Sequence, residues 1–344
     1  MELSRRQVLT AASVATAGAL VSTAGLTPAA AAAATATLIG TTVAAPAIVG
    51  PGPSGQPFQI AFAGGGGYGA GTPNHLINIA HGNDLVHPRV LPYRTGDALG
   101  LAWDGTGMST SLTLAWTHYY DRTRRLNLGR SANGATFDLF PASSHTCLGG
   151  VALTRHDNAV IVGWAGGGGL GGGAPDGRVN VAALGGRPVT LPWRTPSAPA
   201  LAGDPGVSWP DGGPRLYVCW RDAEGYLYFT YCGYRDFGEL LDRRRVQRVE
   251  TRGKAERSSQ SPALAFSGDR LYLAWPAVDR AHHINFKVIA GAGAGQKMTG
   301  SVTASSALAM ESYYRGSARG WTGRYVYRGT DRIGGVYLTD AMPL

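Results

Sequence analysis

The chain has 344 residues and a formal net charge of +9; 44% of its residues are hydrophobic and only 15% are charged. This composition excludes a disordered chain, because it provides enough apolar surface for a sizeable core. The 51 glycines and 20 prolines, together with many aromatic residues, favour short strands joined by tight turns over helical bundles. Length alone allows one large domain or two ordinary ones.

The basic balance of the chain has two interpretations. It indicates either an anionic partner or a coding bias toward arginine, since only Lys254, Lys287 and Lys297 among the 31 basic residues are lysines. The charges are scattered apart from Arg243-Arg244-Arg245 and the stretch 122–125, so we expect no nucleic-acid partner.

Residues 1–36 predict an export signal. Arg5-Arg6 is followed by a mildly apolar stretch over 11–26 and then by an alanine run, the order of a charged, an apolar and a cleavage region. The arginine pair resembles the twin-arginine export signal, which implies a partner in that export machinery and a location outside the cytoplasm. An ordinary secretory peptide with two arginines is the alternative. The stretch is too short for a membrane span, and no later segment is long enough for one.

Strand-like segments recur along the rest of the chain. Three copies each contain a small-residue segment, a longer segment ending in Trp and a third alternating segment; the small-residue segments are 98–102, 198–202 and 261–265. Two more copies contain Ala63–Ala80 and Ala165–Ala182, which are identical at ten of 18 positions. A sixth, degenerate copy runs from Ala307 to Leu338. One aromatic residue marks each copy at intervals of 46–56 residues: Phe62, Trp116, Trp164, Trp220, Trp275 and Trp321.

A period near 50 residues with three or four short strands is typical of a propeller blade. We therefore predict an all-β fold, a six-bladed β-propeller with blades of about 50 residues, occupying residues 37–344 as a single domain. The small-residue segments should line a central channel, and the aromatic row should pack between blades rather than stack on a ligand.

The repeats and the turn Ser131–Phe137, which reads Ser-Ala-Asn-Gly-Ala-Thr-Phe, resemble the bacterial sialidase-like (BNR or Asp-box repeat) propellers. The turn looks like a shortened Asp-box with Asn in place of Asp, which in that family is a structural turn between the third and fourth strands of a blade. The Phe-Arg-Ile-Pro motif of true sialidases is absent, which argues against catalysis. The resemblance implies a site for an acidic sugar.

Three cysteines are present, Cys147, Cys219 and Cys232. A hairpin centred near 223–224 would place Cys219 opposite Tyr228 and Cys232 opposite Arg215, so we expect no essential disulfide between these two. No spacing of Cys or His predicts a metal site, and we expect no cofactor.

The candidate ligand-binding residues surround three arginines at one repeated position. Arg94, Arg194 and Arg257 each stand eight residues before the last Ala of a small-residue segment. The segments 90–95 and 190–195 around the first two match each other, and we interpret them as connections between the outermost and innermost strands. Such arginines would converge at the channel mouth, where guanidinium groups bind a carboxylate in a bidentate manner. The alternative is a structural role in each blade.

Three neighbours complete this candidate site. Tyr93 and Trp193, beside the first two arginines, would stack on a sugar or else cap the core. Asp97 is the nearest carboxylate to Arg94 in sequence.

Glycoside hydrolysis needs an acid together with a nucleophile or base, and the carboxylates form no compelling pair. Glu311 follows a predicted innermost strand and should lie on the face opposite the channel mouth. The prediction is therefore a secreted propeller that binds carbohydrate or another surface ligand at the channel mouth, without turnover. An exo-sialidase-type glycoside hydrolase acting on a terminal acidic sugar and a structural or protein-interaction propeller remain as alternatives.

Overall fold

The computed structural model describes residues 36–51, 56–65, 73–104, 110–119, 124–141, 143–167, 175–204, 213–233, 236–314, 321–331 and 334–339. They belong to one compact unit, Ala34–Leu344. The predicted export signal lies outside the described residues except for its last one, Ala36, which begins a strand. In the described part of the chain, no helix is long and apolar enough to cross a membrane.

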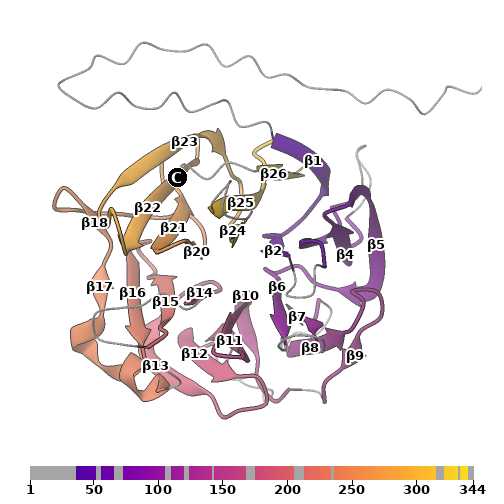
Figure 1. Ribbon diagram of the computed structural model, residues 1–344, viewed down its shortest axis with the longest axis horizontal. Helices are drawn as coiled ribbons and strands as arrows, with labels where there is room; N and C mark the ends of the chain where they lie inside the picture. The colour runs from indigo at the N-terminus through magenta and orange to yellow at the C-terminus, as the bar shows by residue number, and fades with distance from the viewer. Residues whose placement is uncertain are drawn as a thin grey trace, which may run out of the picture. The chain divides into compact units, whose positions relative to one another are not determined.

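Six antiparallel four-stranded sheets surround a central axis like the blades of a propeller (Figure 1). Five blades follow chain order from the innermost to the outermost strand. They are β2 (Ala47–Val49), β3 (Gln59–Ala63), β4 (Leu76–His81) and β5 (Asp84–Arg94); β6 (Gly100–Asp104), β7 (Ser111–Thr117), β8 (Leu126–Ser131) and β9 (Asp138–Leu139); β10 (Cys147–His156), β11 (Ala159–Gly166), β12 (Arg178–Ala183) and β13 (Val189–Arg194); β14 (Ala200–Gly203), β15 (Leu216–Arg221), β16 (Leu227–Cys232) and β17 (Gln247–Arg248); and β20 (Ala263–Ser267), β21 (Arg270–Pro276), β22 (His283–Ala290) and β23 (Lys297–Thr303). The predicted six-bladed all-β propeller is confirmed.

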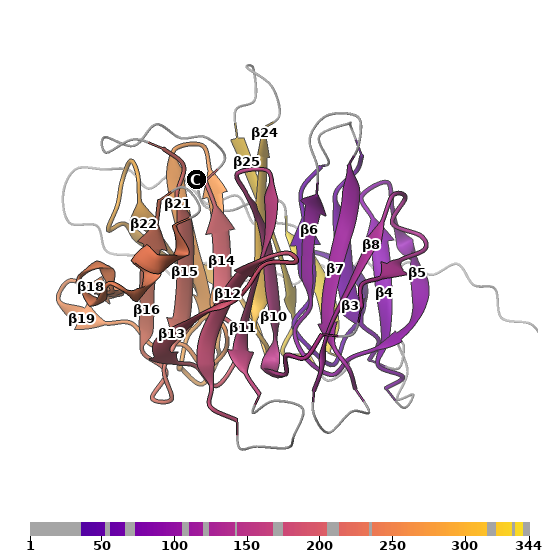
Figure 2. The same cartoon turned by 90° about the horizontal axis from the view of Figure 1, so that it is seen from below.

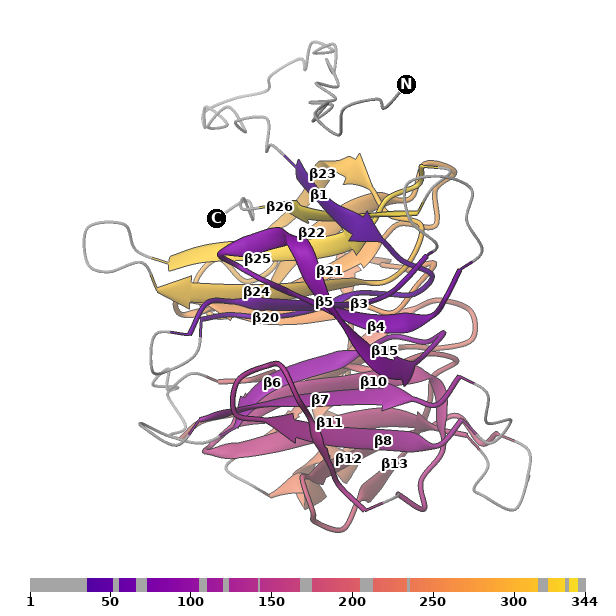
Figure 3. The same cartoon turned by 90° about the vertical axis from the view of Figure 1, so that its right-hand side faces the viewer.

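The sixth blade takes its outermost strand from the other end of the chain. It consists of β24 (Leu308–Tyr314), β25 (Trp321–Arg328), β26 (Gly335–Thr339) and the first strand, β1 (Ala36–Thr41). Residues Ala36 to Thr41 pair with Thr339 to Gly335, so hydrogen bonds between the two chain ends close the ring. Viewed from the side, inner strands such as β10, β14 and β15 run roughly along the axis (Figure 2), and β1 lies beside β26 (Figure 3).

The fourth blade carries extra elements after β16. Two short 3-10 helices, η1 (Phe237–Leu241) and η2 (Arg243–Arg245), precede β17, and a small hairpin of β18 (Glu250–Thr251) and β19 (Lys254–Ala255) follows it. Asp236 and Asp242 cap the helices by accepting hydrogen bonds from backbone N–H groups.

The core lies between blades. Five of the six aromatic markers are at most 3% exposed, and Trp116 of the second blade packs with Ile77, Ile79 and Leu91 of the first. The predicted packing role of this row is therefore confirmed for those five. The prediction of Trp321 as the sixth marker is wrong. Trp321 begins β25, whereas the other five markers stand one or two residues before the ends of their strands. Tyr327, one residue before the end of β25 and 4% exposed, has the corresponding place.

The predicted register of the fourth blade is wrong by one residue. Cys219 lies opposite Phe229, and Cys232 lies opposite Leu216. The cause is the turn after β15, which is centred on Glu224 because the last pair of the hairpin joins Arg221 to Leu227. All three cysteines are buried free thiols.

The turn Ser131–Phe137 does connect the third and fourth strands of its blade, β8 and β9. The Asn133 side-chain oxygen accepts hydrogen bonds from the N–H groups of Ala135 (2.8 Å) and Thr136 (3.3 Å). Gly134 adopts a positive φ of 68°, which favours glycine. An asparagine thus forms the side-chain-to-backbone bonds that shape this turn.

Candidate functional site

The innermost strands line a central channel of about 600 Å³. Its walls are mainly alanine, glycine, proline and leucine, because small side chains let six strands approach one axis. Among the described residues, the charged side chains that line it are Arg155 near the end of β10 and Glu311 in β24. Glu311 therefore lies within an innermost strand rather than after it.

The same hydrogen bond recurs in all six blades along the outer rim. We use this term for the turns where the outermost strand of one blade leads to the innermost strand of the next blade. A buried residue there donates its N–H to the carbonyl of a residue one or two positions before the third strand, at 2.8–3.1 Å. The donors are Thr42, Thr95, Cys147, Thr195, Ser258 and Ala304, and the acceptors are Gly334, His75, Arg124, Gly177, Gly225 and His282. All six acceptors have a positive φ.

Hydroxyl groups at four of these donor positions complete the turn. Thr42, Thr95, Thr195 and Ser258 each donate the side-chain O–H to the carbonyl two residues later, at 2.6–3.4 Å. A serine or threonine that bonds its own backbone in this way redirects the chain locally. The repeated position is therefore built by backbone geometry.

The residue immediately before each donor is Thr41, Arg94, Thr146, Arg194, Arg257 or Thr303. Arginine thus occupies one structural position in three blades, as the sequence offset predicts. The interpretation of segments 90–95 and 190–195 as connections is wrong, because Arg94 and Arg194 are the last residues of the outermost strands β5 and β13. Pro92 and Pro192 are tolerated in these strands because an outermost strand needs no donor on its free side.

This placement overturns convergence at the channel mouth. Three strand spacings, about 14 Å, separate an outermost strand from the innermost strand of its blade. Arg94 and Arg194 also belong to the first and third blades, which are not neighbours. The described lining of the channel contains none of the six predicted ligand-binding residues. The arginines lie on the outer rim, one to a blade boundary.

Arg257 is held against the preceding blade. Its guanidinium donates to the Glu224 carbonyl through Nε (3.0 Å) and through Nη2, and lies 5.1 Å from the centre of the Tyr226 ring. The side chain of Arg257 is nevertheless exposed on the rim.

Tyr93 and Trp193 cap the core between blades. Tyr93 stacks on Trp116 with ring centres 4.9 Å apart, and its hydroxyl donates to the Phe137 carbonyl at 3.3 Å. Trp193 stacks on Trp220 at 5.2 Å. Both rings are half-buried, and each has one face taken by its partner.

Asp97 belongs to a polar group at the boundary between the first and second blades. It accepts a hydrogen bond from the Thr117 hydroxyl at 2.8 Å, and its carboxylate lies 3.8 Å from Nη1 of Arg124. Beside this group the rings of His75 and Tyr119 stack with centres 3.9 Å apart, and Tyr119 is 42% exposed. The N–H of Tyr119 donates to the Arg94 carbonyl, which places this exposed ring next to the first rim arginine.

The third blade places like charges opposite each other. Arg194 in β13 is the cross-strand partner of Arg178 in β12, and both are exposed. Like charges at directly opposed positions repel unless an anion compensates them. Nearby, Arg221 donates through Nε to the Ser197 hydroxyl at 3.3 Å, and burial lowers the pKa of its guanidinium. Sequence reasoning missed Tyr119, Arg178 and Arg221, since cross-strand neighbours follow only from the register.

Comparison with known proteins shows the fold but not a family. No family model matches the chain, and no curated protein matches it. Among solved structures, AofleA from Arthrobotrys oligospora superposes with a TM-score of 0.55 at 10% identity, covering 88% of this chain and 84% of its own. The Penicillium chrysogenum alpha-L-arabinanase complexed with arabinobiose has a TM-score of 0.55 at 13% identity, covering 86% and 92%. At these identities the likeness concerns architecture alone.

Proposed function

We propose that the protein is an exported, non-catalytic propeller that binds carbohydrate carrying a carboxylate, through separate sites on the outer rim. Each site centres on one arginine of the repeated position: Arg94, Arg194 or Arg257. The observation that supports this most is the recurrence of arginine at one hydrogen-bonded position in three blades. Similarity of fold to an arabinanase complexed with arabinobiose adds support for a sugar ligand.

Charge and aromatic surface at these positions suit an acidic sugar. Guanidinium groups bind carboxylates with paired, charge-assisted hydrogen bonds. Tyr119 beside Arg94 and Tyr226 beside Arg257 supply ring surface for the apolar face of a pyranose. A bound carboxylate would also relieve the repulsion between Arg194 and Arg178.

A glycoside hydrolase of sialidase type is the alternative. That chemistry needs two carboxyl groups at a defined separation across the sugar. Among the described residues that line the channel, Glu311 is the sole acidic side chain. This observation favours binding without turnover. A structural or protein-interaction propeller is the third candidate, and it predicts no glycan affinity at all.

The test is a glycan-array screen of the exported protein, followed by calorimetric titration of the best carboxylated sugar and a hydrolysis assay with a fluorogenic sialoside. Changing any one rim arginine to Ala should remove one binding site, with a loss there of about 1.5–3 kcal/mol, the range of a charged hydrogen bond. Higher salt should weaken binding, because exposed charges are screened.

Arg187 provides the matched control. It is exposed in the turn between β12 and β13, at the opposite end of the third blade from Arg194. Arg187→Ala should leave sugar binding unchanged. Equal losses for Arg187→Ala and Arg194→Ala, or lower melting temperatures with unaltered binding in all rim variants, would contradict the proposal. Release of the fluorophore would favour the hydrolase.

A further inference from the structure

Two blades have an outermost strand of only two residues, β9 in the second blade and β17 in the fourth. Elsewhere this strand has six to eleven residues and covers the next blade. Shortening it uncovers the apolar boundary between blades, and the two blades differ in what replaces the missing strand.

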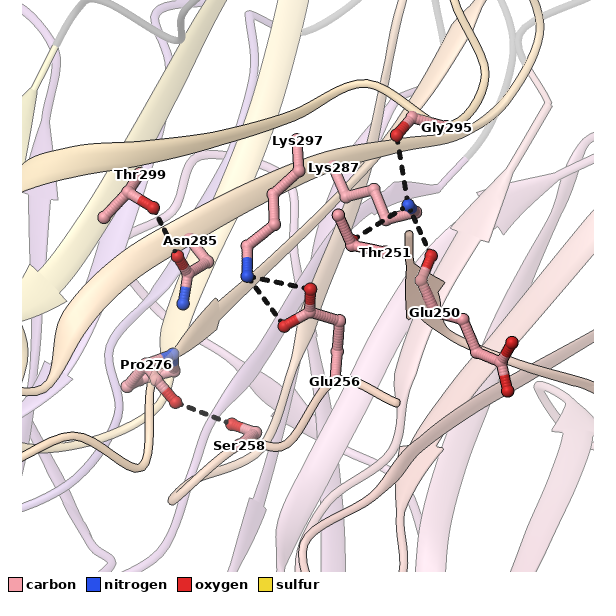
Figure 4. Close-up of polar contacts among 10 residues, drawn as sticks. All are labelled: Glu250, Thr251, Glu256, Ser258, Pro276, Asn285, Lys287, Gly295, Lys297 and Thr299. Atoms are coloured by element: carbon pink, nitrogen blue, oxygen red, sulfur yellow. Dashed lines mark hydrogen bonds and ion pairs between the residues drawn. The ribbon is translucent and has the colours of Figure 1, made fainter. Parts of the chain in front are cut away.

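The fourth blade fills the space with protein (Figure 4). The hairpin β18–β19 lies against the fifth blade, where the Lys287 ammonium donates to the Glu250 carbonyl (2.7 Å), the Gly295 carbonyl (3.1 Å) and the Thr251 hydroxyl (3.2 Å). Lys297 pairs with Glu256 at 2.7 Å and lies over the Trp275 ring at 5.4 Å. The hairpin β18–β19 and the side chains of Lys297 and Glu256 together cover Trp275, the aromatic marker of the fifth blade, which is 0% exposed.

No comparable insertion follows β9 in the second blade: β10 begins at Cys147, eight residues later. A cavity of about 240 Å³ lies there between β8 and the strands β11 and β12 of the third blade. Its walls are apolar and include Leu128, Phe140, Val162 and Leu184. An engineered apolar cavity of about 150 Å³ is already large enough to bind benzene, so this one admits a single six-membered ring with a substituent.

Aromatic surface and two polar groups define the chemistry of the cavity. The His145 and Trp164 rings lie 5.1 Å apart at 40°. Phe140 lies under the Arg130 guanidinium at 5.4 Å, which holds its ring in place. The Ser143 hydroxyl oxygen accepts a hydrogen bond from the backbone N–H of His145 at 2.9 Å, so its own proton can be donated to a ligand.

From this arrangement we propose a second binding site, for a small aromatic ring carrying one hydrogen-bonding substituent, of the phenol class. The ring occupies the apolar space between Leu128, Val162 and Leu184, and the substituent accepts a hydrogen bond from the Ser143 hydroxyl. A pyranose fits poorly, because hydroxyl groups surround its ring while Ser143 and His145 are the polar side chains among the described lining residues. The site is independent of the rim arginines.

The experiment is calorimetric titration of the intact protein with p-cresol, toluene and cyclohexanol. p-Cresol should bind one molecule per chain with a dissociation constant of about 0.1–1 mM, the affinity expected of so small a ligand. Toluene, which lacks the hydroxyl, and cyclohexanol, which is not planar, should bind at least about fivefold more weakly. Ser143→Ala should reduce p-cresol affinity to that of toluene.

Filling the cavity is the decisive variant. Ala182→Leu adds volume at a lining position and should abolish p-cresol binding without lowering the melting temperature. Ala80 has the same register position in the first blade, is 0% exposed, and packs in one cluster with Ile39 of β1, the six-residue outermost strand of the preceding sixth blade, so Ala80→Leu should overpack and destabilise.

Absence of p-cresol binding to the unchanged protein would overturn the proposal, as would binding that survives Ala182→Leu. Variants of Arg94, Arg194 and Arg257 should bind p-cresol normally, so failure of this site and failure of the glycan sites are separable.

Discussion

Lys287 is a buried charge, 7% exposed, and two of its three hydrogen bonds join the fifth blade to the hairpin of the fourth. A compact ammonium with three donors suits this set of acceptors, whereas a planar guanidinium does not. Lys287→Met should lower the free energy of unfolding by about 2–3 kcal/mol, because the three acceptors lose a charged donor. Urea denaturation measures the change.

Lys254 is the control for that substitution, since it is exposed in the same hairpin. Lys254→Met should change the free energy of unfolding by no more than about 0.5 kcal/mol. If the two lysine variants were equally stable, the hydrogen bonds of Lys287 would contribute nothing to holding the blades together.

The buried thiols make the fold sensitive to alkali. Burial raises the pKa of Cys147 and Cys219 far above the ordinary 9.0, and raises the pKa of Cys232 to about 12. The unfolded chain therefore loses these protons first, so stability is complete below pH 9 and falls as the pH rises toward the folded-state values. Burial raises the pKa of Tyr325 and Tyr327 as well, which adds a loss above pH 10.

Urea denaturation between pH 8 and 11 tests this dependence. Each ionising thiol should steepen the decline by about 1.4 kcal/mol per pH unit. Cys219→Ala should make the decline shallower by that amount, whatever its effect at pH 8. An unchanged slope would mean that Cys219 is not protected from ionisation.

At the scale of elements, strand β1 decides whether the ring closes. Ile39 is 3% exposed and packs with Val326, Val336 and Leu338 of the sixth blade and with Phe62 of the first. Ile39→Ala should destabilise by about 2–4 kcal/mol, the range for truncating a buried isoleucine. Thr37 in the same strand is exposed, and Thr37→Ala should stay within about 0.5 kcal/mol. Thermal unfolding of both variants distinguishes a closing strand from a loosely attached one.

At the scale of the whole molecule, the proposed export would have to preserve the strand that closes the ring. β1 begins at Ala36, the last residue of the stretch interpreted as an export signal, so cleavage after Ala36 would leave Thr37 to Thr41 of the strand in the mature protein. If export follows the twin-arginine route, which carries folded proteins, changing both Arg5 and Arg6 to Lys should leave folded precursor in the cytoplasm. Cell fractionation measures this outcome, and normal export of the double variant would indicate an ordinary secretory route.

The fold could be predicted from the sequence because its structural unit is repeated six times. Small residues at 198–202 and 261–265, and a bulky aromatic near the end of each second strand, are required by crowding at an axis and by packing between blades. These demands act within one blade and recur in the next, so they leave a period in the sequence. The equivalence of Arg94, Arg194 and Arg257 was readable for the same reason.

What depended on distant parts of the chain was decided only by the tertiary structure. The pairing of β1 with β26 joins residues at opposite ends of the chain, and no local pattern marks it. The three arginines lie on the outer rim because Arg94 and Arg194 are the last residues of outermost strands. The sequence could not show this, since the same residues form a strand or a connection depending only on their hydrogen-bond partners. The opposition of Arg178 and Arg194 likewise arises from the register of β12 and β13. The cavity in the second blade arises because the two-residue strand β9 leaves part of the third blade uncovered.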